Sequence, residues 1–307
     1  MQRLINSFIS RHVSLLIFSG IPIGLLSGKF ASISSTHLSI ILFFELFIAC
    51  FKIKVEDASS IRITAALRFL LLRYFGLAIA LYYLGTLVSP TLAIALLLLS
   101  LLPTGVTSPG FAGLFGANVL LVLSFVIVSS LSAPLYLPFV LEFLAGSSVQ
   151  IERGKMLFTI LVLVVGPTIV HLPFRRIPRI HSFMVEFNPM LIIPLVWLTT
   201  LVPISRYRDE ILSSPVTSLS YILGYVLLYA LYLGFGYLLG RTENSANQKS
   251  YLLASCIHNV TLGVVLSFLY LPSEVSRQVV FANVSLILVI SLLRGALSRL
   301  VPQSSNS

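Results

Sequence analysis

Long apolar runs follow one another along almost the whole chain, separated by short segments rich in charge, proline, glycine or serine. Of the 307 residues, 57% are hydrophobic and only 10% are charged, whereas about a quarter of the residues of a soluble domain are charged. A helix needs about 20 apolar residues to cross a bilayer, so this length allows roughly ten spans and no sizeable soluble domain. We therefore predict an all-α integral membrane protein with one membrane domain, residues 1–307.

Ten transmembrane helices are predicted from the positions of the runs. They lie near residues 12–28, 36–52, 66–86, 91–116, 118–143, 156–174, 189–204, 218–240, 250–270 and 277–298. The first run has basic residues before it but no obvious small-residue cleavage site after it, so we interpret it as a retained span rather than a signal peptide.

The basic residues predict the orientation. The chain carries a net charge of +10. With ten spans, twelve of the 20 basic residues fall on the side of the amino terminus, six fall on the other side, and Arg68 and Arg73 fall in the third span. Positive loops stay inside, so we expect a multi-pass protein of the cell (inner) membrane with both termini in the cytoplasm. Basic loops also suit contacts with membrane lipid, and nucleic-acid binding is not expected.

The fourth and ninth runs are interrupted. Pro103–Gly110 contains two prolines and two glycines, which cannot continue a regular helix. Ser255–Gly263 occupies the matching place in the second half. The charged segment Glu152–Lys155 divides the chain into two five-helix repeats, residues 1–150 and 151–307, which would lie inverted in the membrane. Interrupted segments at matching positions of inverted halves are typical of the substrate site of a secondary transporter.

The ninth run contains the polar cluster His258, Asn259 and Thr261. Polar groups at membrane depth usually face the bundle interior or a cavity, and histidine can carry a proton near neutral pH. These side chains could instead only join helices by hydrogen bonds. The matching break in the first half favours a functional role.

Glu45 lies in the second span, and Arg68 and Arg73 lie in the third. Folding the hairpin between these spans brings the charges to similar depth, which predicts an intramembrane ion pair. Arg73 could replace a bound cation or attract an anionic substrate, or the pair could only staple the hairpin.

Other motifs carry less information. The Gly236-x-x-x-Gly240 spacing and the series Gly110, Gly113 and Gly116 favour close helix packing. The chain has no zinc-type His/Glu pair, phosphate-binding glycine loop or serine nucleophile motif. We therefore expect neither an enzyme nor a bound cofactor.

The chain resembles the bile acid:sodium symporter family, which belongs to a superfamily that also includes arsenite and riboflavin transporters. The resemblance covers the ten-span layout, and the residues that match the family's motifs lie within about sixty positions. They are Pro103-x-Gly105-x-x-Ser108, Asn118-Val119, Val128-Ser129-Ser130-Leu131-x-Ala133-Pro134, Pro138, His258-Asn259-x-x-Leu262 and Asn283.

The resemblance implies crossed, broken helices 4 and 9 within a core near residues 66–143 and 218–298, beside a panel near 12–52 and 156–204. Its substrates would be organic anions such as bile acids or smaller carboxylates. Ser108 and Asn259 would line the crossing, and Asn283 would face it. The candidate substrate-binding residues are Thr107, Ser108, Asn118, Ser129, His258, Asn259, Thr261 and Asn283.

The positions that correspond to the family's sodium ligands carry side chains without oxygen. They are Pro109, Val122, Val126 and Ala254, and His258 stands where the family has a glutamine. Sodium needs several hard oxygen ligands, so these residues argue against sodium coupling, although backbone carbonyls could still hold the ion weakly.

Three functions remain open. The first is alternating-access transport of a small organic anion, with His258 as the candidate for proton coupling. The second is a sodium-independent facilitator, and the third is a receptor or scaffold that kept the fold without transport. Arsenite efflux is disfavoured because the first break has no cysteine and the second no acidic residue. The compound carried, the direction of transport and the oligomeric state are not defined by the sequence.

Overall fold

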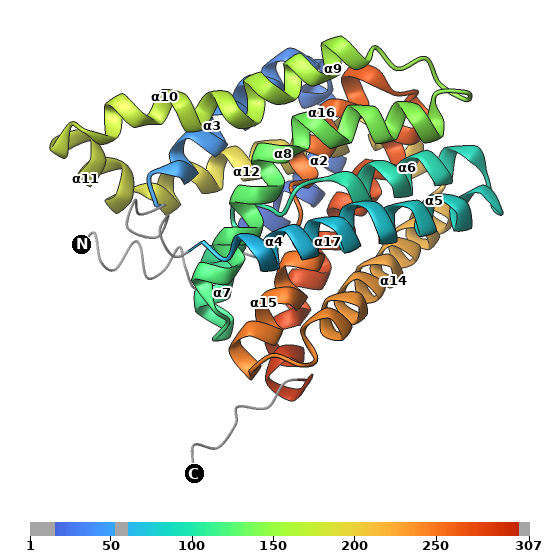
Figure 1. Cartoon of the computed structure of the whole chain (residues 1–307). Coiled ribbons are helices and arrows are strands. Elements are labelled where there is room, and N and C mark those ends of the chain that lie inside the picture. Colours follow the sequence, from blue (N-terminus) through green and yellow to red (C-terminus); the bar gives the residue numbers. More distant parts are fainter. Residues whose placement is uncertain (1–15, 53–60, 301–307) are drawn as a thin grey trace. The chain divides into compact units, whose positions relative to one another are not determined.

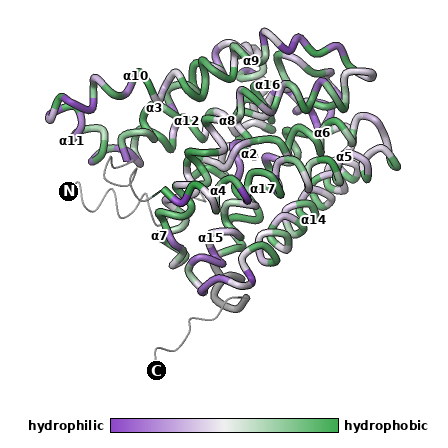
Figure 2. Tube along the Cα trace, in the orientation of Figure 1, coloured by the Kyte–Doolittle hydropathy of each residue, from purple (hydrophilic) through white to green (hydrophobic). Residues whose placement is uncertain are grey.

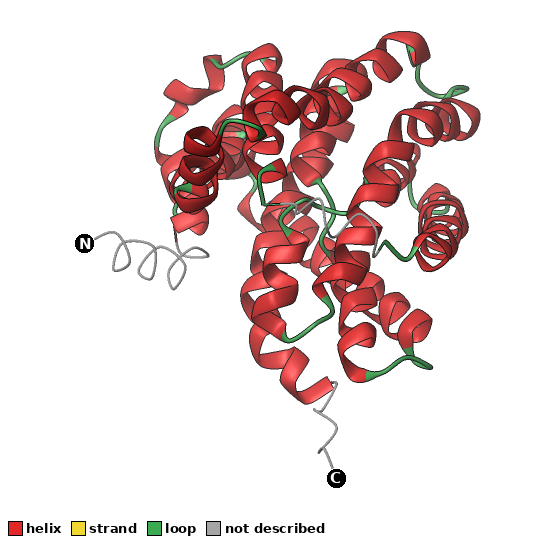
Figure 3. Cartoon of the chain, turned by 60° about the vertical axis from the view of Figure 1, so that its left-hand side comes forward, coloured by secondary structure: helices red, strands yellow, loops and turns green. Residues whose placement is uncertain are grey.

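The computed structural model describes residues 16–52 and 61–300, with side chains up to residue 293. Within these residues the chain is helical, with short loops and no named strand (Figure 3). It divides into two compact units. The first contains the described residues up to 52 together with Phe158–Leu219, and the second contains those from 61 to Leu157 and from Ser220 onward.

Six helices in the described part are long and apolar enough to cross a membrane. They are Ile63–Thr86, Val119–Ala145, Arg153–Arg175, Asn188–Arg206, Pro215–Gly240 and Ser273–Leu293. Shorter apolar helices are Leu16–Leu26, Ser35–Cys50, Pro90–Leu101 and Val260–Tyr270. Figure 2 shows this apolar character as green along most of the helices. The prediction of an all-helical membrane protein is confirmed.

The first unit is built around α12 (Asn188–Arg206), which contacts α2 (Gly20–Leu26), α3 (Ser35–Cys50) and the 3₁₀ helix η1 (Gly28–Ser32). The remaining helices of this unit are η4 (Leu161–Val165), α10 (Gly166–Arg175), α11 (Pro178–Glu186) and α13 (Arg208–Ser213). The helices α9 (Arg153–Ile160) and α14 (Pro215–Gly240) connect the two units along the chain.

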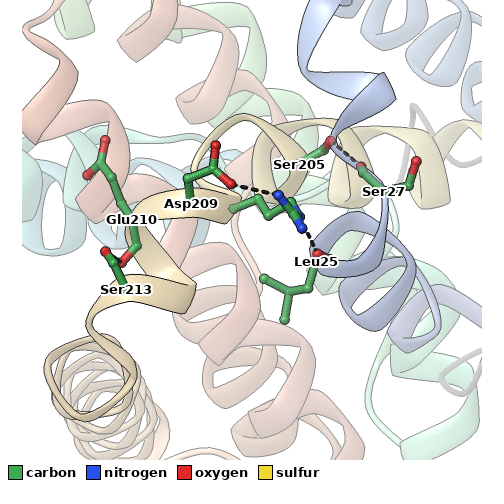
Figure 4. A network of polar contacts seen from close by, with 7 residues as sticks. Leu25, Ser27, Ser205, Asp209, Glu210 and Ser213 are labelled. Carbon is green, nitrogen blue, oxygen red and sulfur yellow. Dashed lines mark hydrogen bonds and ion pairs between the residues drawn. The ribbon is translucent and has the colours of Figure 1, made fainter.

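Polar bonds fasten the carboxyl end of α2 (Figure 4). Arg208 Nε donates to the carbonyl of Leu25 at 2.7 Å, and Ser205 Oγ donates to the carbonyl of Ser27 at 2.7 Å. Arg208 Nη1 also pairs with Asp209 Oδ1 at 2.7 Å. A cation at a helix carboxyl end satisfies free carbonyls and complements the helix dipole, so these contacts stabilise the junction of α2 with α12 and α13.

The second unit is built around α8 (Val119–Ala145). It contacts α4 (Ile63–Leu70), α6 (Pro90–Leu101), α7 (Ser108–Phe115) and α15 (Ser245–Cys256). The helix α17 (Ser273–Leu300) contacts α6, α7 and α16 (Val260–Tyr270). The span Ile63–Thr86 consists of α4, a π-helical segment η3 (Leu71–Leu77) and α5 (Ala78–Thr86) (Figure 1).

Both interruptions predicted from the sequence are present. The fourth run divides into α6, which ends at Leu101, and α7, which begins at Ser108. The ninth run divides into α15, which ends at Cys256, and α16, which begins at Val260. The ninth run also starts earlier than predicted, at Ser245, because Asn244 caps α15 by accepting from the amide of Asn247.

Glycine allows the close packing predicted for α14. A Cβ added at Gly236 would lie 2.6 Å from the carbonyl oxygen of Tyr251, and one at Gly240 would lie 2.9 Å from the Cα of Gln248, both in α15. The same prediction for Gly110, Gly113 and Gly116 is wrong. Added Cβ atoms there would meet nothing closer than 4.0 Å, and Gly116 instead ends α7 with φ +65, a conformation that favours glycine.

Replacing Gly236 with alanine is expected to push α14 away from α15 and to destabilise the protein by about 1–3 kcal/mol. The measurement is the apparent melting temperature of the purified protein in detergent. Gly234→Ala is the matched control, because an added Cβ at Gly234 meets nothing within 4 Å. Equal melting temperatures for the two variants would contradict the close packing.

Candidate functional site

The two breaks meet through their backbones. Thr104 and His258 form an isolated antiparallel bridge. The amide of Gly105 donates to the carbonyl of Ile257 at 2.9 Å, and the amide of Asn259 donates to the carbonyl of Pro103 at 2.8 Å. An unpaired backbone group in the hydrocarbon core costs several kcal/mol, so each break supplies the partners that the other needs.

The residues of the first break explain how the two broken segments approach each other so closely. A Cβ at Gly105 would lie 3.3 Å from the backbone carbonyl of His258, so this position favours glycine. The amide of Thr104 donates to Ser129 Oγ at 3.1 Å, and Thr104 Oγ1 bonds to the hydroxyl of Tyr74 at 2.8 Å. The fully buried Thr104 therefore joins the break to two neighbouring helices.

Two helices begin directly after the breaks, α7 at Ser108 and α16 at Val260. Ser108 Oγ donates to the carbonyl of Ile257 at 3.2 Å, and Asn259 Oδ1 accepts from the amide of Leu262 at 3.1 Å. Ser108 and Asn259 therefore lie at the crossing, as the sequence predicts, and their bonds hold its backbone. Their contact with a substrate stays a prediction.

A buried arginine lies between the two ends that precede the breaks. Arg73 is 1% exposed, and its Nη1 donates to the carbonyl of Ser100 at 2.8 Å. Its Nε donates to the carbonyl of Ser255 at 3.3 Å, and its Cζ lies 4.0 Å from the centre of the Tyr232 ring. The guanidinium is thus held by carbonyl oxygens and by the negative face of an aromatic ring.

His258 packs among tyrosines of α14. Its ring stacks on Tyr229 with centroids 5.4 Å apart and meets Tyr232 edge-on at 5.5 Å. The hydroxyl of Tyr229 lies 3.4 Å from His258 Nε2, and His258 Nδ1 is buried without a hydrogen-bond partner in the described part of the chain. We call Arg73, Tyr229, Tyr232 and His258 the buried cation cluster.

The other candidate substrate residues are distributed around the crossing. Asn118 caps α8 at the amide of Leu121, and its Nδ2 donates to Asn247 Oδ1 at 2.9 Å. Ser129 accepts from the amide of Thr104 in the first break, as described above. Thr107 and Thr261 are partly buried next to the breaks, and Asn283 is buried in α17. Substrate contact by these residues stays a prediction.

The positions that lack sodium-binding side chains also lie in this unit. Val122, Val126 and Ala254 are buried, and Pro109 is partly buried at the start of α7. The carbonyl of Ala254 accepts from Thr104 Oγ1 at 3.4 Å. Over the described residues, no group of three or more His, Cys, Asp or Glu side chains is placed to hold a metal ion.

The predicted ion pair involves residues of different units. Glu45 is buried in α3 of the first unit, and its Oε2 has no hydrogen-bond partner among the described residues. In the second unit Arg68 is exposed, whereas Arg73 is buried on backbone carbonyls. A pairing of Glu45 with either arginine stays a prediction.

Sequence reasoning missed the tyrosines and the carbonyls around Arg73. Tyr225, Tyr229 and Tyr232 recur four and three residues apart, which places them on one face of α14 and is a signal that could have been used. The backbone oxygens of Ser100 and Ser255 leave no such signal, because every residue has a carbonyl.

The fold and the paired breaks define a helical membrane protein, and comparisons with known proteins show its family. The family model described as "Sodium Bile acid symporter family" matches residues 39–214. The uncharacterized protein YbaS of Bacillus subtilis (strain 168) is 24% identical over 203 residues, 62% of this chain and 64% of that protein. The match therefore spans slightly less than two thirds of that relative. The chain belongs to the sodium bile acid symporter family, and its resemblance to that family is confirmed.

Ser129→Ala is expected to destabilise the protein by about 1–3 kcal/mol, because it leaves the buried amide of Thr104 without its acceptor. The loss should appear as a lower melting temperature in detergent. Ser132→Ala is the matched control, since Ser132 Oγ bonds only to carbonyls of its own helix. The role of Ser129 at the break is wrong if both variants melt like the wild type.

Proposed function

We propose that the chain is a secondary transporter of a small organic anion, such as a carboxylate or a bile-acid-like compound. It works by alternating access in the cell (inner) membrane, with both termini in the cytoplasm. The single observation that carries this proposal is the backbone pairing of the two breaks, Thr104 with His258. Broken helices paired near the bilayer midplane are the usual construction of a transporter site.

Several features at the crossing favour an anionic substrate. The helices α7 and α16 begin there, and helix amino ends attract carboxylates. The Arg73 guanidinium lies beside the crossing, where it donates to two backbone carbonyls. Its Nη2 and the hydroxyl of Ser255 are buried without hydrogen-bond partners among the described residues, so donors remain for a ligand.

The division of the chain supports a core and a panel. The second unit contains the helices proposed for the core, near residues 66–143 and 218–298, and the first unit contains those proposed for the panel, near 12–52 and 156–204. We propose that the chain consists of two inverted five-helix repeats, residues 1–150 and 151–307, and that each repeat contributes helices to both parts. The breaks at matching positions of the two halves support this arrangement.

His258 is the candidate proton carrier. It is buried at the crossing, it bears an unpartnered Nδ1, and its Nε2 lies near the Tyr229 hydroxyl. A sodium-independent facilitator is the second candidate function. It is favoured because a proton on His258 would add a second positive charge to the cluster that already contains Arg73, which is costly in a buried site.

The test is uptake of labelled carboxylates into proteoliposomes that contain the full chain, with pH and sodium gradients imposed separately. Proton-coupled transport predicts accumulation driven by the pH gradient, with at least about a tenfold lower rate in His258→Ala if the imidazole carries the proton. His37→Ala is the matched control, because His37 is an exposed residue of α3 whose Nδ1 bonds to Ser34.

Each outcome separates the candidates. Carboxylate exchange that depends on neither gradient and is unchanged in His258→Ala supports the facilitator and contradicts proton coupling. Accumulation driven by sodium contradicts both candidates. No uptake across a broad panel of carboxylates overturns the transport of this substrate class and favours a receptor or scaffold.

A further inference from the structure

Arg73 bonds to the carboxyl ends of both half-helices that precede the breaks. Its acceptor Ser100 is the penultimate residue of α6, and its acceptor Ser255 is the penultimate residue of α15. One side chain thus connects two segments that are 155 positions apart in the sequence, and it does so at the depth of the crossing.

The positive charge of Arg73 balances the partial negative charges of these two helix ends. The carboxyl end of a helix carries about half a negative charge, so two converging ends offset roughly one positive charge. A single guanidinium provides that charge. Within its own unit, the partners of Arg73 are the carbonyls of these two ends and the aromatic ring of Tyr232.

Carbonyls at the ends of broken helices are the groups that coordinate the coupling cation in many secondary transporters. We propose that Arg73 is a built-in cation that occupies such a position, so that the protein needs no sodium ion there. This inference rests on the proposed transport function, because it assigns the reason that transport would be independent of sodium.

The local backbone around Arg73 supports a functional role for its charge. Arg73 lies in the π-helical segment η3, which interrupts the span Ile63–Thr86. Such π-helical turns are uncommon and often mark functional sites. The Tyr232 hydroxyl also bonds to Ser100 Oγ at 2.8 Å, so the ring under the guanidinium is fixed by the same helix end.

The experiment measures sodium binding to the purified full-length protein in detergent, with labelled sodium and with melting curves in sodium chloride or choline chloride. The wild type is expected to show no saturable sodium binding and the same melting temperature in both salts. Arg73→Ala is expected to melt lower in choline and to regain about half of the loss or more in sodium, as a ligand of the folded state would produce.

Three further variants sharpen the result. Arg73→Gln also removes the charge and serves if the alanine variant does not fold. Arg73→Lys keeps a cation and should not respond to sodium. Lys155→Gln is the control, because Lys155 is an exposed cation at the start of α9 and should behave as wild type.

Saturable sodium binding by the wild type would overturn the proposal, and this result needs no variant. A neutral Arg73 variant that folds and gains no sodium response would show that Arg73 only joins helices, which also overturns it. Neither measurement uses an organic anion. A failure of the proposed transport in proteoliposomes is therefore distinguishable from a failure of this inference.

Discussion

The structure depends on one constraint, that backbone groups released where a membrane helix breaks need partners away from water. Each break in this chain meets that constraint mostly through the other break. Gly105 donates to Ile257, and Asn259 donates to Pro103. Three further carbonyls of the same ends accept from side chains: those of Ser100 and Ser255 from Arg73, and that of Leu101 from the Tyr136 hydroxyl at 2.9 Å. Backbone and side-chain bonds together therefore hold the crossing.

The same bonds determine the electrostatics of the crossing. They bring two helix carboxyl ends to Arg73, while two helix amino ends begin on the other side of the breaks at Ser108 and Val260. The carboxyl ends favour a cation and the amino ends favour an anion. In the account given above the protein supplies the cation itself and leaves the anion as the transported species.

Much of the fold could be predicted from the sequence. The positions of the apolar runs and the breaks at Pro103 and Ser255 follow from backbone chemistry that proline, glycine and membrane depth dictate. The close approach of Gly236 to α15 was predictable from its spacing with Gly240, but the lack of neighbours at Gly110 and Gly113 was not. Glycine spacing shows which faces permit contact, whereas tertiary packing decides which face receives it.

The candidate site was predictable only in part. His258 and Asn259 were found because polar residues stand out in an apolar run, and Ser108 was found through the resemblance to a known family. The acceptors of Arg73 could not be found, because they are main-chain oxygens that become available only after the helices end. The ion pair of Glu45 with Arg68 or Arg73 stays a prediction. The carbonyl partners of Arg73 belong to helix ends, whose charge does not show in the residue types.

The central claim is that the two breaks hold each other in a fixed, bonded crossing. Hydrogen exchange of the full chain in nanodiscs, followed by mass spectrometry of peptides covering residues 100–108 and 252–262, tests it most directly. The account predicts that the amides of Gly105 and Asn259 exchange as slowly as those of the adjoining helices, although neither residue is helical. Fast exchange at both amides, beside slow exchange in α6 and α15, would contradict it.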